Sequence, residues 1–314
     1  MIADYVTFSK NVFIPVTNVC RNRCHYCGFR RDAAHPDAFL MTPEQVDEVL
    51  RVGSSSSCTE ALFTFGQPSH HDVIDYVAEL CQMAIERGLL PHTNAGVVSY
   101  ADLKKLKPLN VSMGLMVETV GELEAHRDSP DKVPALRLKT IEDAGRLKIP
   151  FTTGILVGIG ETWNDRIESL LAIKKLHAKY GHIQEVIIQN FLPKPNTPMA
   201  NHPPPTIRDM QQMIATAREI LPQEIAIQVP PNLMPPQLSI PWGASDLGGI
   251  STETVDHINP EREWPAVNEL NAMGISMKER LPIYPRFIAA GWHGEEVGEL
   301  VERYADENGF RNDE

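Results

Sequence analysis

The chain has 314 residues, of which 42% are hydrophobic and 22% charged, and its formal net charge at pH 7 is -12. This composition is typical of a globular protein whose core needs no disulfide bonds, and the negative charge argues against a nucleic-acid partner. The sequence shows neither a secretory signal pattern at its start nor an apolar stretch of transmembrane length, so we expect a cytoplasmic protein with no membrane partner.

Segments typical of strands and of helices alternate along the chain. Short apolar runs rich in β-branched residues predict strands, and amphipathic segments that begin at a capping residue predict helices. Thr42 precedes a proline and lies three residues before Gln45, which predicts a helix start with a capping box. In chain order we expect strand 11–17, a helix from Thr42, strand 61–65, helix 72–87, strand 90–94, helix 99–107, strand 111–117, helix 135–147, strand 151–157, helix 162–180, strand 185–191, helix 206–221, strand 225–229, and helices near 265–272 and 295–304.

This alternation predicts an α/β fold with a parallel sheet and right-handed crossovers. The length fits one domain over residues 1–314, a TIM-type (β/α)8 barrel. Seven strands are visible, so the eighth is expected within 230–265. That stretch is rich in proline, glycine and aspartate, and we expect it to form a loop-rich cap over the mouth of the barrel. The polar tail 306–314 is expected to be frayed.

Polar and small residues follow the predicted strands at their carboxyl ends. In α/β barrels the chemistry lies at these ends, so residues that follow different strands meet in one mouth. The residues concerned are Cys20 after the first strand, 66–68 after the second, Asn94 after the third, Glu118 after the fourth, 158–161 after the fifth, and Gln189 and Asn190 after the sixth.

Cys20, Cys24 and Cys27 lie within eight residues, in the segment CRNRCHYC. In a chain without a secretion signal, this spacing favours a metal site over a disulfide framework. Three thiolates on one loop can each bind one iron of a cubane cluster, which leaves the fourth iron without a protein ligand. A zinc site with His25 or a distant residue as fourth ligand is the alternative, although structural zinc usually shows two separated ligand pairs.

The spacing CxxxCxxC, with the aromatic Tyr26 before the third cysteine, resembles the signature of the radical S-adenosylmethionine (SAM) superfamily. The resemblance implies a [4Fe–4S] cluster at the C-terminal mouth of the barrel, with SAM chelating the fourth iron. It also implies that one-electron reduction releases a 5′-deoxyadenosyl radical, which abstracts a hydrogen atom from the substrate. The electron would come from a low-potential donor such as a ferredoxin or flavodoxin.

Beyond the cysteines, the chain resembles one family within that superfamily, the 7,8-didemethyl-8-hydroxy-5-deazariboflavin (FO) synthases. The similarity spans residues 5–270, through segments such as ALFTFG, PHTNAG, SMGLMVE, SPDKVPALRLKTIEDAGRLKIPFTTGILVGIGET, QNFLPKPNTPM and DLGGISTETVDHINPEREWP. It implies a small-molecule substrate made by a sister radical SAM enzyme, 5-amino-5-(4-hydroxybenzyl)-6-(D-ribitylimino)-dihydrouracil. A carbon–nitrogen lyase reaction would close its ring, expel ammonia and form FO, the precursor of a deazaflavin coenzyme.

Other functions remain open at this point. Within the superfamily, the alternatives are the sister enzyme that forms the adduct, and relatives from the menaquinone pathway or from hydrogenase maturation. Outside it, the cysteines are compatible with a non-catalytic iron–sulfur sensor or with a zinc-dependent barrel hydrolase.

The resemblance also implies contacts with the methionine and ribose parts of SAM. Gly66 and Gln67 stand where the superfamily binds the methionine amino group, largely through backbone carbonyls, and Gln67 replaces the acidic residue of many relatives. Glu118 is expected to accept hydrogen bonds from the ribose. Arg137 is expected to pair its guanidinium group with the SAM carboxylate.

Two further features are expected to lie against SAM. Gly158 and Glu161 belong to the segment GILVGIGE, which resembles the adenine-binding strand and turn of the family. Glycines there let the backbone approach a flat base closely. Tyr26 adds an aromatic face beside the cluster.

Polar residues of the mouth are candidates for substrate binding. Amide side chains can hydrogen-bond the edges of a uracil, and the glycine-rich late segment offers donors and acceptors for a ribityl chain. His257 is a candidate catalytic proton carrier, because histidine titrates near neutral pH. The candidates for substrate contact are Asn94, Gln189, Asn190, Asp246, Asp256 and Asn259.

Overall fold

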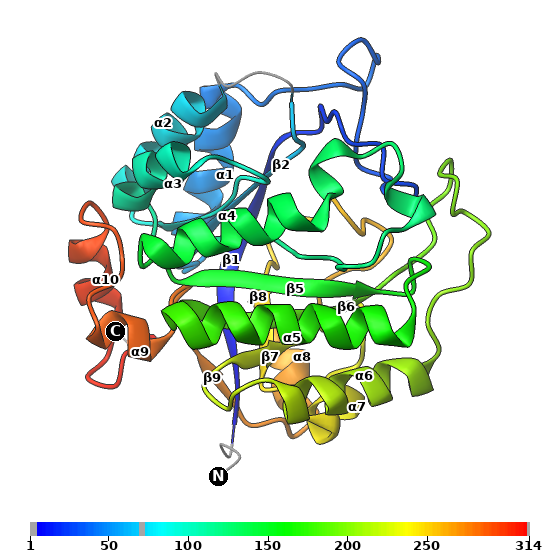
Figure 1. Cartoon of the computed structure of the whole chain (residues 1–314). Helices are drawn as coiled ribbons and strands as arrows, with labels where there is room; N and C mark the ends of the chain where they lie inside the picture. The colour runs from blue at the N-terminus through cyan, green and yellow to red at the C-terminus, as the bar shows by residue number, and fades with distance from the viewer. Residues whose placement is uncertain (1–4, 69–72, 313–314) are drawn as a thin grey trace.

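The computed structural model describes residues 5–68 and 73–312. Eight parallel strands form a closed barrel, in which strands β2 to β8 pair in chain order and β1 pairs with both β2 and β8 (Figure 1). This confirms the expected (β/α)8 barrel, with its eighth strand inside 230–265. The barrel strands are β1 (Val6–Thr17), β2 (Glu60–Phe65), β3 (Leu90–Asn94), β4 (Ser112–Gly114), β5 (Phe151–Val157), β6 (Ile183–Asn190), β7 (Ala226–Gln228) and β8 (Asp246–Ile250).

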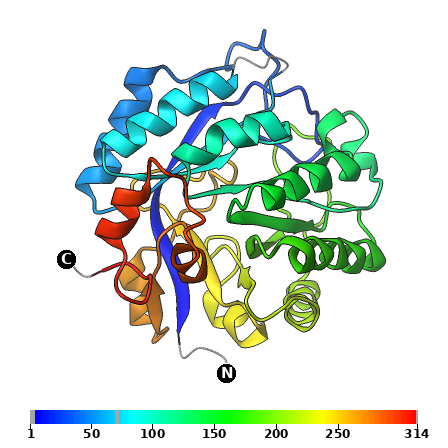
Figure 2. The same cartoon turned by 60° about the vertical axis from the view of Figure 1, so that its left-hand side comes forward.

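Helices that connect successive strands from β1 to β7 cover the outside of the barrel (Figures 1 and 2). Capping boxes at Thr42, Ser99, Thr162 and Thr206 fix four of their starts, as the sequence patterns at Thr42 and Thr162 predict. Asp72, the first residue of predicted helix 72–87, lies outside the described residues. The helices are α1 (Pro43–Ser55), α2 (Val73–Glu86), α3 (Tyr100–Leu106), α4 (Pro134–Arg146), α5 (Trp163–Tyr180) and α6 (Ile207–Ile220).

The main core lies between the strands and this layer of helices. Every residue of β5 is buried, as expected for a parallel strand with the barrel interior on one face and helices on the other. Phe151 and Ile155 of β5 belong to the same apolar cluster as Ile141 of α4 and Leu170 of α5. Among the residues described, no helix is both long and apolar enough to cross a membrane.

The C-terminal part of the chain closes the end of the barrel where the strands begin. α9 (Pro285–Ala289) and α10 (Gly298–Tyr304) lie at the end where β5 starts, and Figure 2 brings that end forward. Ile283 packs there against Leu90, the first residue of β3. β9 (Met277–Glu279) pairs with the start of β1. Access to the barrel interior is therefore from the opposite end, where the strands finish.

The structure differs from the expected elements in a few places. β4 ends at Gly114 rather than 117, although Glu118 still bridges to Ile155 of β5. Residues 306–312 are not frayed, because Phe310 and Arg311 form bridges to Arg280 and Ala305. The sequence patterns did not predict the short elements β9 and α9. The remaining short helices are η1 (Lys107–Leu109), η2 (Glu124–His126), η3 (Pro130–Lys132), α7 (Pro236–Ser239), η4 (Ile240–Trp242) and α8 (Val267–Ala272).

Candidate active site

A cavity of about 410 Å³ opens at the C-terminal ends of the strands and extends into the barrel. Its walls bring together residues that are far apart in the chain, including the three cysteines of the CxxxCxxC segment. Most candidates named from the sequence line this cavity, as the strand-end rule predicts. They are Cys20, Cys24, Tyr26, Cys27, Gly66, Gln67, Asn94, Glu118, Arg137, Gln189, Asn190, Asp256 and Asn259.

The cysteine loop follows β1 directly. Cys24 is buried, whereas Cys20 and Cys27 are half-buried. Within the described parts of the chain, no three His, Cys, Asp or Glu side chains form a group that could hold a single metal ion. A cubane instead takes one thiolate at each of three irons, so the thiols need not converge on one point. The donor set of three thiols facing one cavity fits such a cluster.

Burial raises the pKa of the Cys27 thiol, while the Arg30 backbone opposes that shift. In the protein alone this favours the neutral thiol. A bound metal reverses the preference, because it stabilises the thiolate.

Residues 124–132, between β4 and α4, clamp the cysteine loop from outside. Arg21 and Asn22 both donate side-chain hydrogen bonds to the buried carboxylate of Asp131, at 2.7 Å from Arg21 Nε and 3.0 Å from Asn22 Nδ2. The Asp131 backbone N–H donates in return to Asn22 Oδ1 at 2.9 Å. The backbone of the loop is held as well, by a bond from His25 N to Ala125 O at 3.0 Å. These bonds hold the loop in place through the protein alone.

Two polar side chains among the described residues donate hydrogen bonds to sulfurs of the CxxxCxxC segment. Ser129 Oγ lies 3.3 Å from Cys24 Sγ, and Asn22 Nδ2 lies 3.7 Å from Cys20 Sγ. Hydrogen bonds to ligand sulfurs set the reduction potential of iron–sulfur clusters. Sequence reasoning missed both residues. Asn22 lies inside the motif and offered a local signal, whereas Ser129 is distant in sequence.

Tyr26 is fixed by a neighbouring histidine. Its hydroxyl lies 3.0 Å from His126 Nε2, and the Lys132 ammonium lies 5.8 Å from its ring centre. Burial lowers the pKa of His126 to about 4, with Lys132 adding to the effect, and burial raises that of Tyr26 well above its usual value. Both groups are therefore neutral near pH 7, and one hydrogen bond joins them, with its direction set by the imidazole tautomer. The Tyr26 ring faces the cavity in one fixed orientation.

Glu118 forms an ionised cluster with Lys132 and Arg137 at the cavity wall. The Lys132 ammonium bonds to the Glu118 carboxylate, and an Arg137 guanidinium nitrogen lies 3.7 Å from it. Burial alone would raise the pKa of Glu118, but Lys132 and Arg137 outweigh it and lower the pKa. Glu118 is thus a carboxylate near neutral pH. Lys132 was not identified from the sequence, because a lone lysine in a loop gives no signal.

Arg137 is itself buried and bound to backbone carbonyls. Its Nε donates to Met116 O at 2.6 Å, and another guanidinium nitrogen donates to Asp131 O at 3.2 Å. The side chain therefore ties α4 to the segment after β4 and to the clamp of the cysteine loop. One part of its guanidinium group remains directed at Glu118 and the cavity.

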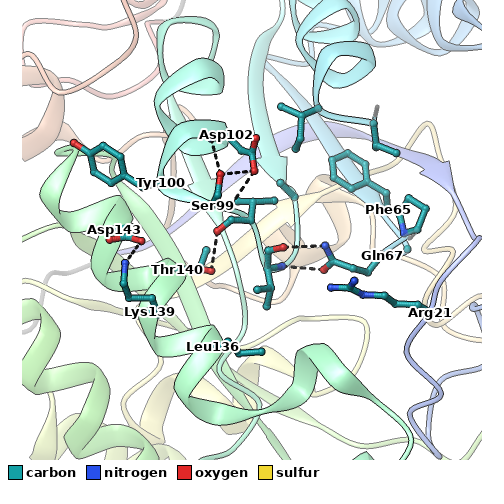
Figure 3. A pocket seen from close by; sticks show the side chains of 17 residues that line it. Arg21, Phe65, Gln67, Ser99, Tyr100, Asp102, Leu136, Lys139, Thr140 and Asp143 are labelled. Carbon is teal, nitrogen blue, oxygen red and sulfur yellow. Dashed lines mark hydrogen bonds and ion pairs between the residues drawn. The ribbon is translucent and has the colours of Figure 1, made fainter. Parts of the chain in front are cut away.

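Gly66 and Gln67 line the main cavity and also a second cavity of about 450 Å³. The second cavity lies beside α2, α3 and α4 (Figure 3). The Gln67 amide is paired with the backbone of Val97, donating to its carbonyl and accepting from its N–H, each at 2.9 Å. A Cβ at Gly66 would lie 2.3 Å from Val19 O, so only glycine fits there. Gln67 thus joins the loops after β2 and β3, with one N–H and the oxygen of its amide group engaged by Val97.

Two buried oxygens in the cavity wall have no hydrogen-bond partner among the described residues. They are Thr64 Oγ1, at the end of β2, and Asn190 Oδ1, at the end of β6. A buried polar atom without a partner is costly, which favours a polar ligand in this cavity. Asn94 is placed over Gly114, where a Cβ would lie 2.2 Å from its Oδ1.

Four candidates do not line the cavity. Glu161 uses its carboxylate within its own turn, accepting from Gly158 N, Ile159 N and Arg166 Nε, each at 2.7 Å. The Glu161 side chain therefore holds the turn together, and the expected contact of this segment with SAM stays a prediction. Gly158 has φ +100° and a Cβ there would lie 2.6 Å from Pro205, so packing and turn geometry account for the glycine.

Asp246 and His257 are the other two candidates that do not line the cavity. Asp246 is the first residue of β8 and lies at the closed end of the barrel, where Arg280 Nε donates to it at 2.7 Å. The prediction that it contacts substrate in the mouth is wrong, because the eighth strand begins at this residue rather than before it. His257 is half-buried and packs on Phe13, with ring centres 5.8 Å apart. It touches the cavity wall through Phe13 rather than lining it.

Comparison with known proteins identifies the family. Residues 14–173 match the radical SAM superfamily. The chain is 55% identical to the 7,8-didemethyl-8-hydroxy-5-deazariboflavin synthase of Methanococcoides burtonii, with 98% of each chain covered. It is 53% identical to the synthase of that name from Methanosarcina barkeri, with 98% of this chain and 99% of the relative covered. The synthase from Archaeoglobus fulgidus is 50% identical over 97% of this chain and 98% of its own length.

Solved structures agree with the fold. Methylornithine synthase superposes with a TM-score of 0.72 and 20% identity, covering 87% of this chain and 84% of that one. A maturase of the [FeFe]-hydrogenase, HydG, superposes with a TM-score of 0.77 and 17% identity, covering 96% and 70%. The chain belongs to the radical SAM superfamily and, within it, to the family of 7,8-didemethyl-8-hydroxy-5-deazariboflavin synthases, whose cofactors are a [4Fe–4S] cluster and SAM.

Proposed function

We propose that this protein closes the deazaflavin ring. The substrate is 5-amino-5-(4-hydroxybenzyl)-6-(D-ribitylimino)-dihydrouracil, the product is FO, and ammonia leaves in a carbon–nitrogen lyase reaction. The full-length similarity to synthases of this name carries the proposal. A cavity that combines three cysteines with unpaired amide and hydroxyl oxygens supports it, because the substrate must lie beside the cluster and offers many polar groups.

A bound cluster and SAM would supply one-electron radical chemistry. Cys20, Cys24 and Cys27 would hold the cluster through their thiolates. Glu118, kept ionised by Lys132, accepts hydrogen bonds from the SAM ribose. Arg137, beside Glu118, meets the carboxylate of SAM with the part of its guanidinium group that faces the cavity.

Apolar side chains limit the water around the reacting groups. Leu62, Leu115, Leu156 and Ile187 are apolar residues of the cavity wall. An organic radical needs such a wall, because side reactions with solvent are suppressed in a closed apolar site. Asn94, Gln189 and Asn190 hydrogen-bond the substrate in this arrangement, with Asn190 Oδ1 gaining the partner it lacks.

The proposal implies two partners. A sister radical SAM enzyme makes the adduct, and a ferredoxin or flavodoxin supplies the electron. The half-buried Cys20 and Cys27 lie on the loop with Arg21, Arg23 and Arg30. Asp131 pairs with Arg21 and Asp32 with the other two, so one net positive charge of these five side chains is left to attract an acidic electron donor.

The test is an anaerobic assay of the reconstituted enzyme with the adduct, SAM and a chemical reductant. We expect blue-fluorescent FO with the matching mass, together with 5′-deoxyadenosine and ammonia. The Cys24→Ser variant, treated in parallel, should give none of these products. Absence of FO from protein with a full cluster would reject the ring-closing reaction.

The same assay separates the alternatives. Activity only with the adduct's precursors would indicate the sister enzyme. Failure to form 5′-deoxyadenosine above background would indicate a sensor. A colourless protein with stoichiometric zinc after anaerobic purification would indicate a zinc enzyme.

A further inference from the structure

Lys194 was not among the candidate site residues identified from the sequence. It lies in the loop after β6, yet it is only 7% exposed and it lines the main cavity. Its side-chain stem packs over Gly28, where a Cβ would lie 3.2 Å from Lys194 Cβ. Burial of a lysine is costly unless its charge is paired, so this position calls for an explanation.

Two partners hold the Lys194 ammonium group. It donates to Asn259 Oδ1 at 2.8 Å and to the carboxylate of Glu261. An ammonium group has three N–H donors. The two bonds to residues of the loop after β8 account for two of them, which leaves one donor on a residue that lines the cavity together with Asn259.

Asp256 fixes the orientation of this arrangement. Its carboxylate accepts from Asn259 N and Asn259 Nδ2, each at 3.0 Å, and from Asn232 Nδ2 at 3.0 Å. Because the amide nitrogen of Asn259 points at Asp256, its oxygen is left to point at Lys194. Asp256 and Asn259, expected from the sequence to touch the substrate, are thus bonded to each other and to the lysine.

The position of Lys194 in the barrel separates it from the expected SAM site. Gly66 follows β2 and Glu118 follows β4, whereas Lys194 follows β6 and Asn259 follows β8. In a closed barrel ordered β1 to β8, these two sets follow strands on opposite sides of the mouth. The Lys194 stem also reaches Gly28, beside Cys27, so the measured SAM affinity is part of the test.

We propose that the Lys194 ammonium binds a carbonyl oxygen of the pyrimidine ring of the substrate, with Asn259 and Asp256 as positioning residues. An ammonium group only donates hydrogen bonds, so its partner must be an acceptor. The pyrimidine carbonyls and the imine nitrogen are the substrate's groups that only accept, whereas the amino group and the ribityl and phenol hydroxyls both donate and accept. Of the acceptor-only groups, a carbonyl oxygen offers two lone pairs at the edge of the ring. This assignment rests on the proposed function and names the part of its substrate that this wall recognises.

The test compares Lys194→Met and Lys194→Arg with the wild-type enzyme. Each is reconstituted anaerobically, and the SAM dissociation constant, the KM for the adduct, kcat and the ratio of 5′-deoxyadenosine to FO are measured. We expect Lys194→Met to raise the KM at least tenfold, which corresponds to a loss of about 1.4 kcal/mol in binding free energy. The ratio of 5′-deoxyadenosine to FO should also rise, because a loosely held substrate reacts less often with the radical that is formed. The SAM dissociation constant should not change. Lys194→Arg should recover part of the affinity, since it restores a cationic donor.

Lys179→Met is the matched control, because Lys179 is exposed and pairs with Glu142 at the surface. Cluster absorbance and SAM binding show whether each variant has folded. An unchanged KM in both Lys194 variants, or weaker SAM binding with an unchanged KM, would overturn the assignment of Lys194 alone. If wild-type enzyme makes no FO from the adduct, the proposed function fails and the assignment falls with it. If Lys194→Met does not fold, the assignment is tested by the KM for the adduct in Lys194→Arg and in Asn259→Leu. We expect Asn259→Leu to raise that KM.

Discussion

The hydroxyl of Ser129 donates a hydrogen bond of 3.3 Å to the sulfur of Cys24, and both residues are buried. A donor to a ligand sulfur stabilises the more negative, reduced cluster. We therefore expect Ser129→Ala to lower the midpoint potential of the reconstituted cluster. EPR-monitored redox titration measures the potential directly, without substrate. Ser129→Thr keeps the hydroxyl and is the matched control. Equal potentials in Ser129→Ala and wild type would show that the bond has no effect on the cluster.

Asp131 links the cysteine loop to the segment before α4. Asp131→Asn should weaken the bonds from Arg21 and Asn22, by about 1.5 to 3 kcal/mol for hydrogen bonds to a charged group. Iron content after reconstitution should fall, and loss of the cluster in air should be faster. Asp75→Asn is the control, because Asp75 lies on α2 away from the cysteine loop and its side chain is 75% exposed. Equal iron content and equal loss rates in the two variants would contradict the role of the clamp.

The Gln67 amide both donates to and accepts from the backbone of Val97. Gln67→Glu replaces the donor to Val97 O by a carboxylate, so two acceptors would face each other. We expect a loss of about 1 to 3 kcal/mol in the free energy of unfolding at pH 8. Part of it should return at acidic pH, where a protonated glutamate donates again. Gln211→Glu on the exposed face of α6 is the control. Denaturant unfolding of the two variants at both pH values provides the comparison.

Glu60 gives the stability of the protein a specific pH dependence. It is buried at the start of β2, where Ser9 Oγ donates to it at 2.6 Å and Arg280, Glu185 and Asp246 are the nearby charged groups. Burial raises the pKa of Glu60 from 4.5 to about 7, against the lowering effect of Ser9 and Arg280. Between these values the folded state binds the proton and the unfolded state does not. The contribution of Glu60 to stability therefore falls as pH rises from 4.5 to about 7, by about 3 kcal/mol in all.

The Glu60→Gln variant removes this titration. As pH rises from 4.5 to about 7, the free energy of unfolding of the variant should increase relative to that of the wild type. Above pH 7 the difference between the two proteins should stay constant. Glu48→Gln, at an exposed position of α1, should show no such trend. Urea titrations from pH 4.5 to 8 measure all three proteins. A difference that does not vary with pH would show that Glu60 ionises normally in the folded state.

Local sequence patterns were sufficient to predict the barrel. Predicted strands 90–94 and 151–157 coincide with β3 and β5, and the capping box at Thr42 lies where the sequence places it. These features depend on residues that are close in sequence, such as an apolar run or a capping pair. The strand-end rule then placed the three cysteines, Glu118 and Asn190 in one cavity, because parallel strands share one direction.

What the sequence did not reveal depends on contacts between distant segments. Lys194, Lys132 and Ser129 carry no local signal, and only the fold brings them to Asn259, Glu118 and Cys24. Asp246 was misplaced for a similar reason. A polar residue inside a glycine-rich stretch gives no sign that a strand starts there, with a buried arginine opposite.

The pairing of β1 with β8 has a consequence for how the protein is made. The ribosome releases the cysteine loop early, but the ring of strands has no closing partner until residues 246–250 have emerged. Until then the three thiols lack the wall that carries Asp256 and Asn259. A cluster can therefore enter a fully closed site only after residues 246–250 have been synthesised. A chain that stops before them presents its thiols to oxidants.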